Sequence, residues 1–360
     1  MPHDENEIHE APAEPVSALD HQAVAEQVPA RDPARARRIR LIAAAIAGAL
    51  VIAAGSATVT AFALTRTSDG AMGAMEPSTA APTATAGAGP VVNTAGFPTG
   101  GPGIFTDTCL RTTTAPNDPI LMPGMTGMSM QHDFFGNTGT TASSVTTQLV
   151  GSGTSCSTTA DASAYWTPVL SQSGKALTPR STLIYWRAQQ GAQKGVQSIP
   201  TGLTMIAGDE GALAPQGKQT IGWTCSGFQQ VTLSDSPHDC AAGAFLRLVI
   251  TFPNCWDGHT LDGAQQTNVV AMTGKSCPSS HPVQIPQVVM HINYPTSSAA
   301  DLTLSVGPTS QGLITTEHAD FMNGWNEPVL TADVKACIVT GTRCGPVSGA
   351  DAVPKGGKVR

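Results

Sequence analysis

The sequence predicts a mostly β fold: a disulfide-stapled, β-sandwich-like domain of two sheets with long loops and a short C-terminal helix, preceded by one transmembrane helix. Three observations predict it. Charged residues make up only 12% of the 360 residues, whereas Gly and Pro number 37 and 27, which disfavours a helical bundle and suits a loop-rich β domain. Short β-branched or aromatic runs recur between turn residues. All eight cysteines follow a single long apolar run.

The apolar run, residues 41–64, carries no charge. As a helix it would rise about 1.5 Å per residue and cross the roughly 30 Å hydrocarbon core of a bilayer. Four arginines lie within the six residues before it and only Arg66 follows closely, so we expect a single-pass cell-membrane protein with a cytoplasmic N-terminus and an extracellular C-terminal domain. A signal peptide cleaved after residues 61–63 is the alternative, although the 40 residues ahead of the run exceed a usual n-region.

The remaining segments differ in composition. Residues 1–40 combine Ala, Pro and Glu without an aromatic residue and predict a disordered cytoplasmic tail. Residues 65–103 are rich in Ala, Thr, Pro and Gly and predict a flexible linker. Residues 104–347 form the expected extracellular domain, and residues 348–360 a flexible tail.

Secondary structure within the domain is predicted from short runs. One helix is expected at Leu330–Cys337, with Thr331 as the N-cap and Lys335 near its C-terminal end. Turn residues separate several β-branched or aromatic runs, some with a period near two. These runs predict strands at residues 181–187, 220–225, 245–252, 288–294 and 302–306.

The cysteines predict disulfides, because their even number is confined to the exported side. There is no CxxC pair, which argues against a zinc ribbon. Connectivity does not follow from sequence, and sequential pairing is our working assumption. Each bridge would contribute about 2–4 kcal/mol. The assumed pairs are Cys109–Cys156, Cys225–Cys240, Cys255–Cys277 and Cys337–Cys344.

Candidate functional residues gather in four short clusters of His, Asp or Cys with aromatic residues and Gly or Pro, which stand out in a charge-poor domain. They span residues 132–137, 252–259, 277–282 and 318–325. We expect the candidate catalytic groups Asp133, Asp257, Asp320, His281 and His318 to converge on one cleft. Candidate ligand-binding residues are His132, Asn137, Trp166, Trp256, Asn323 and Trp325.

Three functions compete. Two of the aspartates could supply the carboxylate pair of a glycoside hydrolase, with tryptophans as platforms for sugar rings. A metal could be bound by His132, His281 and His318 with Asp257, since imidazole and carboxylate suit Zn²⁺, although the spacing fits no short metal motif. The clusters could also form a binding groove without catalysis. No cofactor or metal ligand is assigned on sequence alone.

The same residues also have ordinary structural interpretations. An Asp next to Gly is often a turn residue, a Cys-Trp pair is often packed in the core, and His with Pro often closes a loop. A serine nucleophile has little support, because Ser279 and Ser280 adjoin His281 without a GxSxG elbow. Nucleic acid is discounted as a partner, because the chain has a net charge of −7 and no basic run outside the juxtamembrane arginines.

Five blocks, in this order and spacing, resemble the domain of unknown function nineteen-ninety-six family over residues 105–340. They are HDFFGN (132–137), SAYWTPVL (163–170), FPNCWDG (252–258), CPSSHPVQIP (277–286) and HADFMNGW (318–325). The resemblance implies a secreted or membrane-anchored protein of the kind found in actinobacteria and fungi. Fungal members are often joined to WSC carbohydrate-binding modules, which implies cell-envelope polysaccharide as the partner, by analogy. The family carries no settled activity.

This chain departs from the family pattern at two places. Members often carry a second His two residues before His132, where this chain has Met130. Many also carry two histidines after the CWDG block, where residues 261–268 here read LDGAQQTN. Both departures remove imidazoles, so they favour a carboxylate site or a binding role over a multi-histidine metal site.

Overall fold

The computed structural model describes residues 103–189, 191–227 and 232–344. The expected cytoplasmic tail, membrane helix and C-terminal tail, with all of the linker but Gly103, lie outside these residues. Among the described residues no helix is both long and apolar enough to cross a membrane. The chain divides into the units Met1–Ala80 and Ala81–Arg360, and every described residue belongs to the second.

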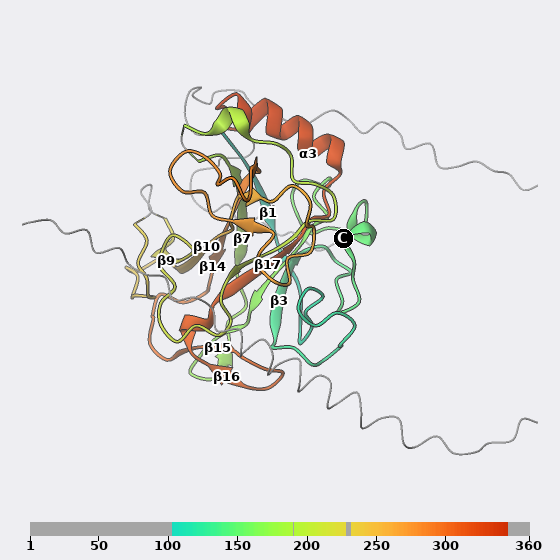
Figure 1. Cartoon of the computed structure of the whole chain (residues 1–360). Helices are drawn as coiled ribbons and strands as arrows, with labels where there is room; N and C mark the ends of the chain where they lie inside the picture. The colour runs from blue at the N-terminus through green and yellow to red at the C-terminus, as the bar shows by residue number, and fades with distance from the viewer. Residues whose placement is uncertain (1–102, 190, 228–231, 345–360) are drawn as a thin grey trace, which may run out of the picture. The chain divides into compact units, whose positions relative to one another are not determined.

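One five-stranded antiparallel sheet contains four of the five predicted strands, each within one residue of its expected ends (Figure 1). These runs form strands because β-branched and aromatic side chains suit a pleated surface that packs on neighbours. In order across the sheet, the strands are β1 (Ile104–Cys109), β7 (Ser181–Arg187), β14 (Gln287–Asn293), β10 (Leu246–Thr251) and β9 (Ile221–Cys225).

A second five-stranded antiparallel sheet carries two of the four sequence clusters. Its first two strands are irregularly paired, with a register shift between Arg111 and Thr113. The strands β3 and β17 contain the HDFFG and HADFM segments, and β4 lies between them. In order, the strands are β2 (Arg111–Ala115), β3 (His132–Gly136), β4 (Ala164–Pro168), β17 (His318–Met322) and β8 (Thr204–Gly208).

Two smaller antiparallel sheets complete the architecture, so two sheets alone do not describe this domain. The fifth predicted strand, residues 302–306, belongs to one of them as β15. That sheet has the order β16 (Gln311–Gly312), β15 (Leu302–Ser305), β5 (Leu170–Gln172), β6 (Lys175–Ala176). The other has the order β12 (Val269–Val270), β11 (Cys255–Trp256), β13 (Val283–Gln284).

Aromatic side chains from both five-stranded sheets share one core. Trp186 of β7 lies 5.8 Å, centroid to centroid, from Phe321 of β17, and Phe105 of β1 stacks on Trp186 at 5.7 Å. Phe252, just after β10, is also 6.3 Å from Phe321. These rings each bury a large apolar area. Their contacts occupy one face of each sheet, so the other face of the β3–β4–β17 region is free to carry different side chains.

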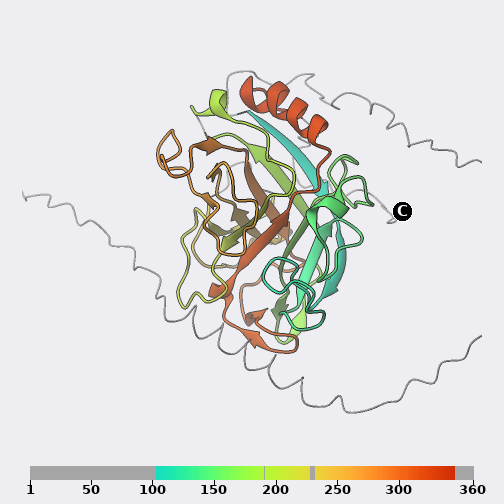
Figure 2. The same ribbon diagram turned by 45° about the vertical axis from the view of Figure 1, so that its right-hand side comes forward.

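The C-terminal helix is present but begins earlier than predicted. α3 spans Glu327–Asp333 and continues as a π-helix, η3, over Val334–Val339 at one end of the sheets (Figures 1 and 2). Thr331 is not the N-cap: Asn326 is, and its side chain accepts a hydrogen bond from the Val329 amide. Pro328 near the helix start favours this earlier beginning. The short helices are α2 (Thr146–Leu149), η1 (Gln193–Gly195) and η2 (Ile314–Thr316).

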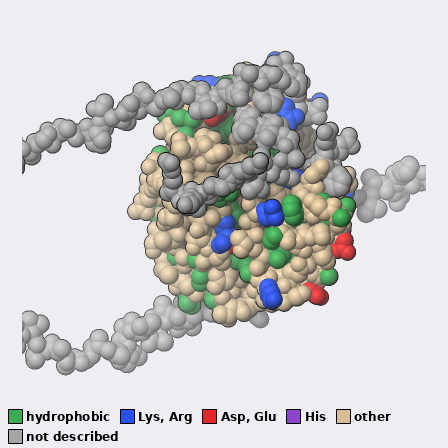
Figure 3. Space-filling view, turned by 180° about the vertical axis from the view of Figure 1, so that it is seen from behind, with side chains coloured by type: hydrophobic (Ala, Val, Ile, Leu, Met, Phe, Trp, Pro, Cys, Tyr) green, Lys and Arg blue, Asp and Glu red, His purple; other side chains and the backbone are tan. Residues whose placement is uncertain are grey.

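All eight cysteines are paired, and the assumed sequential connectivity is confirmed. The bonds join Cys109 to Cys156, Cys225 to Cys240, Cys255 to Cys277 and Cys337 to Cys344. The first three join a terminal residue of β1, β9 or β11 to a loop later in the chain, and the last one closes the end of η3. On the face seen in Figure 3, basic and acidic side chains are scattered singly among uncharged ones.

Candidate metal centre

The outer face of the second sheet brings the first and fourth clusters together. Phe134 of β3 and Asp320 of β17 both pair with Trp166 of β4, so these three side chains share one face of the sheet. Side chains alternate along a strand. His132 and His318 therefore project from the same face as Asp320.

These three residues form a compact buried cluster. One ligand-type atom from each lies within 4.8 Å of those of the other two. The His318 Nε2 to Asp320 Oδ2 distance is 3.7 Å, and the two imidazole centroids are 5.8 Å apart. All three side chains are essentially shielded from solvent. We call His132, His318 and Asp320 the HHD cluster.

Backbone carbonyls orient both imidazoles. The Nδ1 atom of His132 lies 2.9 Å from the carbonyl oxygen of Asn117, and that of His318 lies 2.9 Å from the carbonyl oxygen of Thr316. A carbonyl only accepts, so each Nδ1 must carry the hydrogen. In the neutral ring each Nε2 then presents a lone pair. A hydrogen bond from the other ring nitrogen to a carbonyl is the usual arrangement of a metal-binding histidine.

The atoms that face one another in the cluster lack other partners. Among the described residues, His132 Nε2, His318 Nε2 and both carboxylate oxygens of Asp320 are buried and make no hydrogen bond. A buried polar group without a partner costs free energy, and an unpaired buried charge costs much more. A cation between the lone pairs and the carboxylate would satisfy all three side chains at once.

Burial sets the protonation states. Burial, followed by the nearby His318, lowers the pKa of His132 to about 3. Burial likewise lowers the pKa of His318. Both imidazoles are therefore neutral at pH 7, as metal coordination requires. Burial, then the charges of Asp118 and Glu210, raise the pKa of Asp320 well above its ordinary value.

The surroundings of the HHD cluster are acidic. Asp118 is 2% exposed and lies in the loop between β2 and β3, where one carboxylate oxygen accepts hydrogen bonds from the amides of Ile120 and Leu121. Asp209 and Glu210 follow β8 and are exposed. Gly208 pairs with His318 and has a φ of +99°. A Cβ at this position would lie 2.7 Å from the Glu317 carbonyl oxygen, so a larger residue would not fit beside His318. These carboxylates give the cluster a negative field that attracts cations.

Comparison with known proteins identifies the family. A family model described as "Domain of unknown function (DUF1996)" matches residues 118–325, more than half of the chain. The chain belongs to this family. No curated protein and no solved structure matches it. The matched segment contains the whole HHD cluster and Asp118, so the cluster lies within the part that makes this chain a DUF1996 protein.

The DUF1996 domain does not assemble the expected pair of Asp133 and Asp320. Asp133 pairs with Thr167, the neighbour of Trp166, so its side chain projects from the opposite face of the sheet. There it accepts a hydrogen bond from Thr114 and lies 3.7 Å from Arg111. Burial raises its pKa to about 6 despite these partners. A sheet therefore separates two carboxylates that a glycosidase mechanism requires on either side of one bond.

Asp257 and His281 also lie outside the HHD cluster. The Asp257 carboxylate accepts hydrogen bonds from the amides of His259 and Thr260, as a turn residue does. His281 Nε2 lies 2.8 Å from the carbonyl oxygen of Thr267. Of the five expected catalytic groups the HHD cluster contains only His318 and Asp320, and of the hypothetical ligand set of three histidines with Asp257 it contains only His132 and His318. The spacing in sequence could not distinguish turn residues from ligands.

Most of the expected ligand-binding residues are buried or hydrogen-bonded within the domain. Trp166 is fully buried and Trp325 is 2% exposed, so neither offers a platform to a sugar ring. Trp256 is half-buried and donates to the Thr260 carbonyl oxygen. The side-chain amide of Asn137 donates to the Ala162 carbonyl oxygen, and the side-chain amide of Asn323 donates to the Pro200 carbonyl oxygen. Of the six expected binding residues, His132 alone lies in the HHD cluster.

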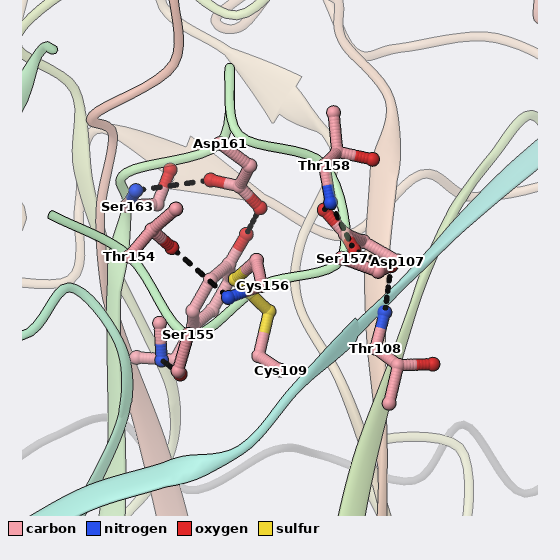
Figure 4. The surroundings of a disulfide bond; sticks show 12 residues. Asp107, Thr108, Cys109, Thr154, Ser155, Cys156, Ser157, Thr158, Asp161 and Ser163 are labelled. Atoms are coloured by element: carbon pink, nitrogen blue, oxygen red, sulfur yellow. Dashed lines mark hydrogen bonds between the residues drawn. A yellow bond between two sulfur atoms is a disulfide. The ribbon is translucent and has the colours of Figure 1, made fainter. Parts of the chain in front are cut away.

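A second buried acidic pair lies beside the Cys109–Cys156 disulfide (Figure 4). Asp107 accepts hydrogen bonds from the Ser157 hydroxyl and the Thr158 amide, and Asp161 accepts one from the Tyr165 hydroxyl at 2.7 Å. Burial, followed by Asp161, raises the pKa of Asp107 to about 8. These carboxyls have hydrogen-bond donors and the sulfurs are bonded to each other, so this pair joins strand to loop and has no free ligand set.

Sequence reasoning missed Asp118 and grouped the histidines differently. The Asp-Pro pair at 118–119 reads as an ordinary turn. The signal that pointed to the cluster was the repeated His-x-Asp or His-Asp pattern in the first and fourth blocks. In HDFFG the Asp is adjacent to His and faces away from it, whereas in HADFM it is two residues on and faces the same way.

Proposed function

We propose that this DUF1996 domain is a metal-dependent hydrolase that removes acyl groups from cell-envelope polysaccharide. The observation that carries the proposal is the HHD cluster: two neutral imidazoles and one carboxylate with unpartnered ligand atoms within 4.8 Å. Two His and one carboxylate are a common ligand set for catalytic Zn²⁺ and for non-haem Fe²⁺. His132, His318 and Asp320 would hold the ion.

A bound ion of this kind supplies a Lewis acid that polarises a carbonyl and lowers the pKa of bound water. This chemistry suits an ester or amide carbonyl. A glycosidic bond has no carbonyl and requires paired carboxylates, which Asp133 and Asp320 do not form. Polysaccharide as the substrate is supported by the expected extracellular location and by the family resemblance alone.

Residues around the HHD cluster would have separate roles in this reaction. The carbonyls of Asn117 and Thr316 orient the imidazoles, and burial keeps both rings neutral. Asp118 is the buried carboxyl whose charge acts on both His318 and Asp320. Since burial raises its pKa, it is the candidate to hold or release a proton beside the substrate.

The test combines metal analysis with product analysis. The purified full-length chain should contain about one equivalent of a transition metal, and His318→Ala should lose it. On isolated actinobacterial wall polysaccharide, the wild-type chain should release acetate or another acyl acid, and chelation should stop this release. Released reducing sugar without acyl acid would instead indicate a glycosidase, and retention on the wall with no product would indicate a binding module. Either result would refute the proposed reaction.

A further inference from the structure

The loop ahead of His132 has a regular methionine pattern. Residues 122–130 read MPGMTGMSM, so four of the eleven methionines of the chain lie within nine residues. No charged residue occurs between Pro119 and Gln131. The HHD cluster uses none of these sulfurs, and no feature of the proposed hydrolase explains them.

Two consecutive turns place the first three methionines at regular intervals. The Met125 amide donates to the Met122 carbonyl oxygen at 3.1 Å, and the Met128 amide donates to the Met125 carbonyl oxygen at 3.3 Å. Gly124 and Gly127 occupy the third position of each turn with φ of +76° and +78°, as type II turns require. A β-turn brings its first and fourth Cα atoms within about 7 Å. Met125 belongs to both turns and is therefore close to each of the other two.

The methionine side chains are accessible. Met125 is 47% exposed and Met128 is 57% exposed, whereas Met122 is half-buried. A Cβ added at either turn glycine would meet nothing within 4 Å, so the surface of the turns is open. Leaving large apolar side chains in water sacrifices about 25 cal/mol for each Å² that burial would cover. Met125 and Met128 therefore present accessible thioether sulfurs at two successive turns.

The loop is held in place at several points. The Gly127 amide donates to the Asn117 side chain at 3.1 Å, and the Ser129 amide donates to the Pro116 carbonyl oxygen at 3.1 Å. The Gly124 amide donates to the Ala142 carbonyl oxygen at 2.7 Å. The backbone of the turns is thus fixed, while methionine side chains remain adaptable. A fixed backbone lowers the entropy lost on closing three side chains around one ligand.

We propose that Met122, Met125 and Met128 form a thioether site for a soft monovalent cation, Cu(I) above all. Thioethers are soft ligands that select Cu(I), whereas hard cations require oxygen ligands, and residues 119–131 contain no carboxylate. All eight cysteines are disulfide-bonded, so no thiol of the folded chain competes for the ion. Unbranched side chains at successive turn corners allow three sulfurs to meet at one ion. The site uses no residue of the HHD cluster and does not depend on the proposed hydrolysis.

The test titrates the full-length chain with Cu(I), kept reduced by ascorbate without oxygen, against a chromogenic Cu(I) chelator. One Cu(I) per chain should leave the chelator. The triple variant M122L/M125L/M128L retains apolar volume and removes the sulfurs, and it should bind Cu(I) at least about tenfold more weakly. M125L should be the most damaging single change. Met290→Leu, at a fully buried position, is the matched control and should change nothing.

Two further measurements make the result decisive. His318→Ala should retain Cu(I) binding, and X-ray absorption should find sulfur around the ion. Unchanged binding in the triple variant would overturn the proposal and leave the loop as an apolar contact surface. Loss of Cu(I) in His318→Ala with retention in the triple variant would assign the ion to the imidazoles and also overturn it. Circular dichroism of each variant ensures that a lost site is not a lost fold.

Discussion

The substitution Asp320→Asn should have opposite effects on stability in the absence and presence of metal. Without metal, the Asp320 carboxyl is fully buried, has no hydrogen-bond partner among the described residues and has a strongly raised pKa. In the unfolded chain its pKa returns toward 3.8. Folding therefore places this carboxyl where it is either protonated or charged and unpaired, and a buried polar group without a partner costs about 1–3 kcal/mol, more when it is charged.

An asparagine at this position avoids that cost. In the presence of a chelator, D320N should therefore be more stable than the wild-type chain by about 1–3 kcal/mol at pH 7. One kcal/mol shifts the melting temperature of a domain of this size by about 2–4 °C, so a rise of several degrees is expected. Because the pKa of Asp320 is raised in the folded chain, the wild-type carboxyl destabilises the fold only when the pH rises above the pKa that this group has in the unfolded chain. The stability advantage of D320N over the wild-type chain should therefore shrink toward zero near pH 4.

Metal reverses the order. An ion at 1,000 times its dissociation constant stabilises the native state by about 4.1 kcal/mol, which is more than the unpaired carboxyl costs, and the loss of the carboxylate ligand should abolish that gain in D320N. The assay is thermal unfolding of both chains, each with a chelator and with Zn²⁺, Fe²⁺ or Mn²⁺, at pH 4.5 and pH 7. The reasoning is refuted if no ion stabilises the wild-type chain and D320N is the less stable chain in chelator.

Three other substitutions give simpler tests. Burial, followed by Asp161, raises the pKa of Asp107 to about 8. The free energy of unfolding of the wild-type chain should therefore fall as the pH rises from about 4 to about 8. In Asp107→Asn this fall should be smaller, as measured by urea unfolding at pH 5 and pH 9. Asp133→Asn should leave the metal content unchanged in elemental analysis, because Asp133 is on the opposite face of the sheet from the HHD cluster; loss of the metal would contradict that placement. Asp257→Asn should leave product release unchanged and reduce stability by about 1 kcal/mol through its turn hydrogen bonds, and an inactive but stable variant would return Asp257 to the site.

The strands and disulfides could be predicted because their signals are local. β7 occupies the expected residues 181–187, and alternating burial along it reflects a period of two readable from STLIYWR. The cysteines could be assigned to disulfides from their number and their position after the apolar run. Sequential pairing is correct in this domain: each bond joins a cysteine to the next one along the chain, at sequence separations of 47, 15, 22 and 7 residues.

The metal cluster could be predicted only in part. His132, His318 and Asp320 were each singled out, because ionisable residues are rare and grouped in this chain. Their partners were wrong, because proximity depends on which strands are neighbours and on the face from which each side chain projects. β3 and β17 are separated by β4 in the sheet, and a shift of one residue in register would have exchanged Asp133 for His132 on the outer face.

By itself, the sequence determined that this chain forms a mostly β domain with four disulfides and belongs to the DUF1996 family, because composition, period and motif order are properties of neighbouring residues. Only the tertiary structure decided which polar side chains meet. It buried both imidazoles against backbone carbonyls, placed a carboxylate oxygen of Asp320 within 4.8 Å of a ring nitrogen of each, and set Asp133 on the other side of the sheet. Long-range strand register and the exclusion of water convert scattered residues into a site, and neither can be derived from one segment alone.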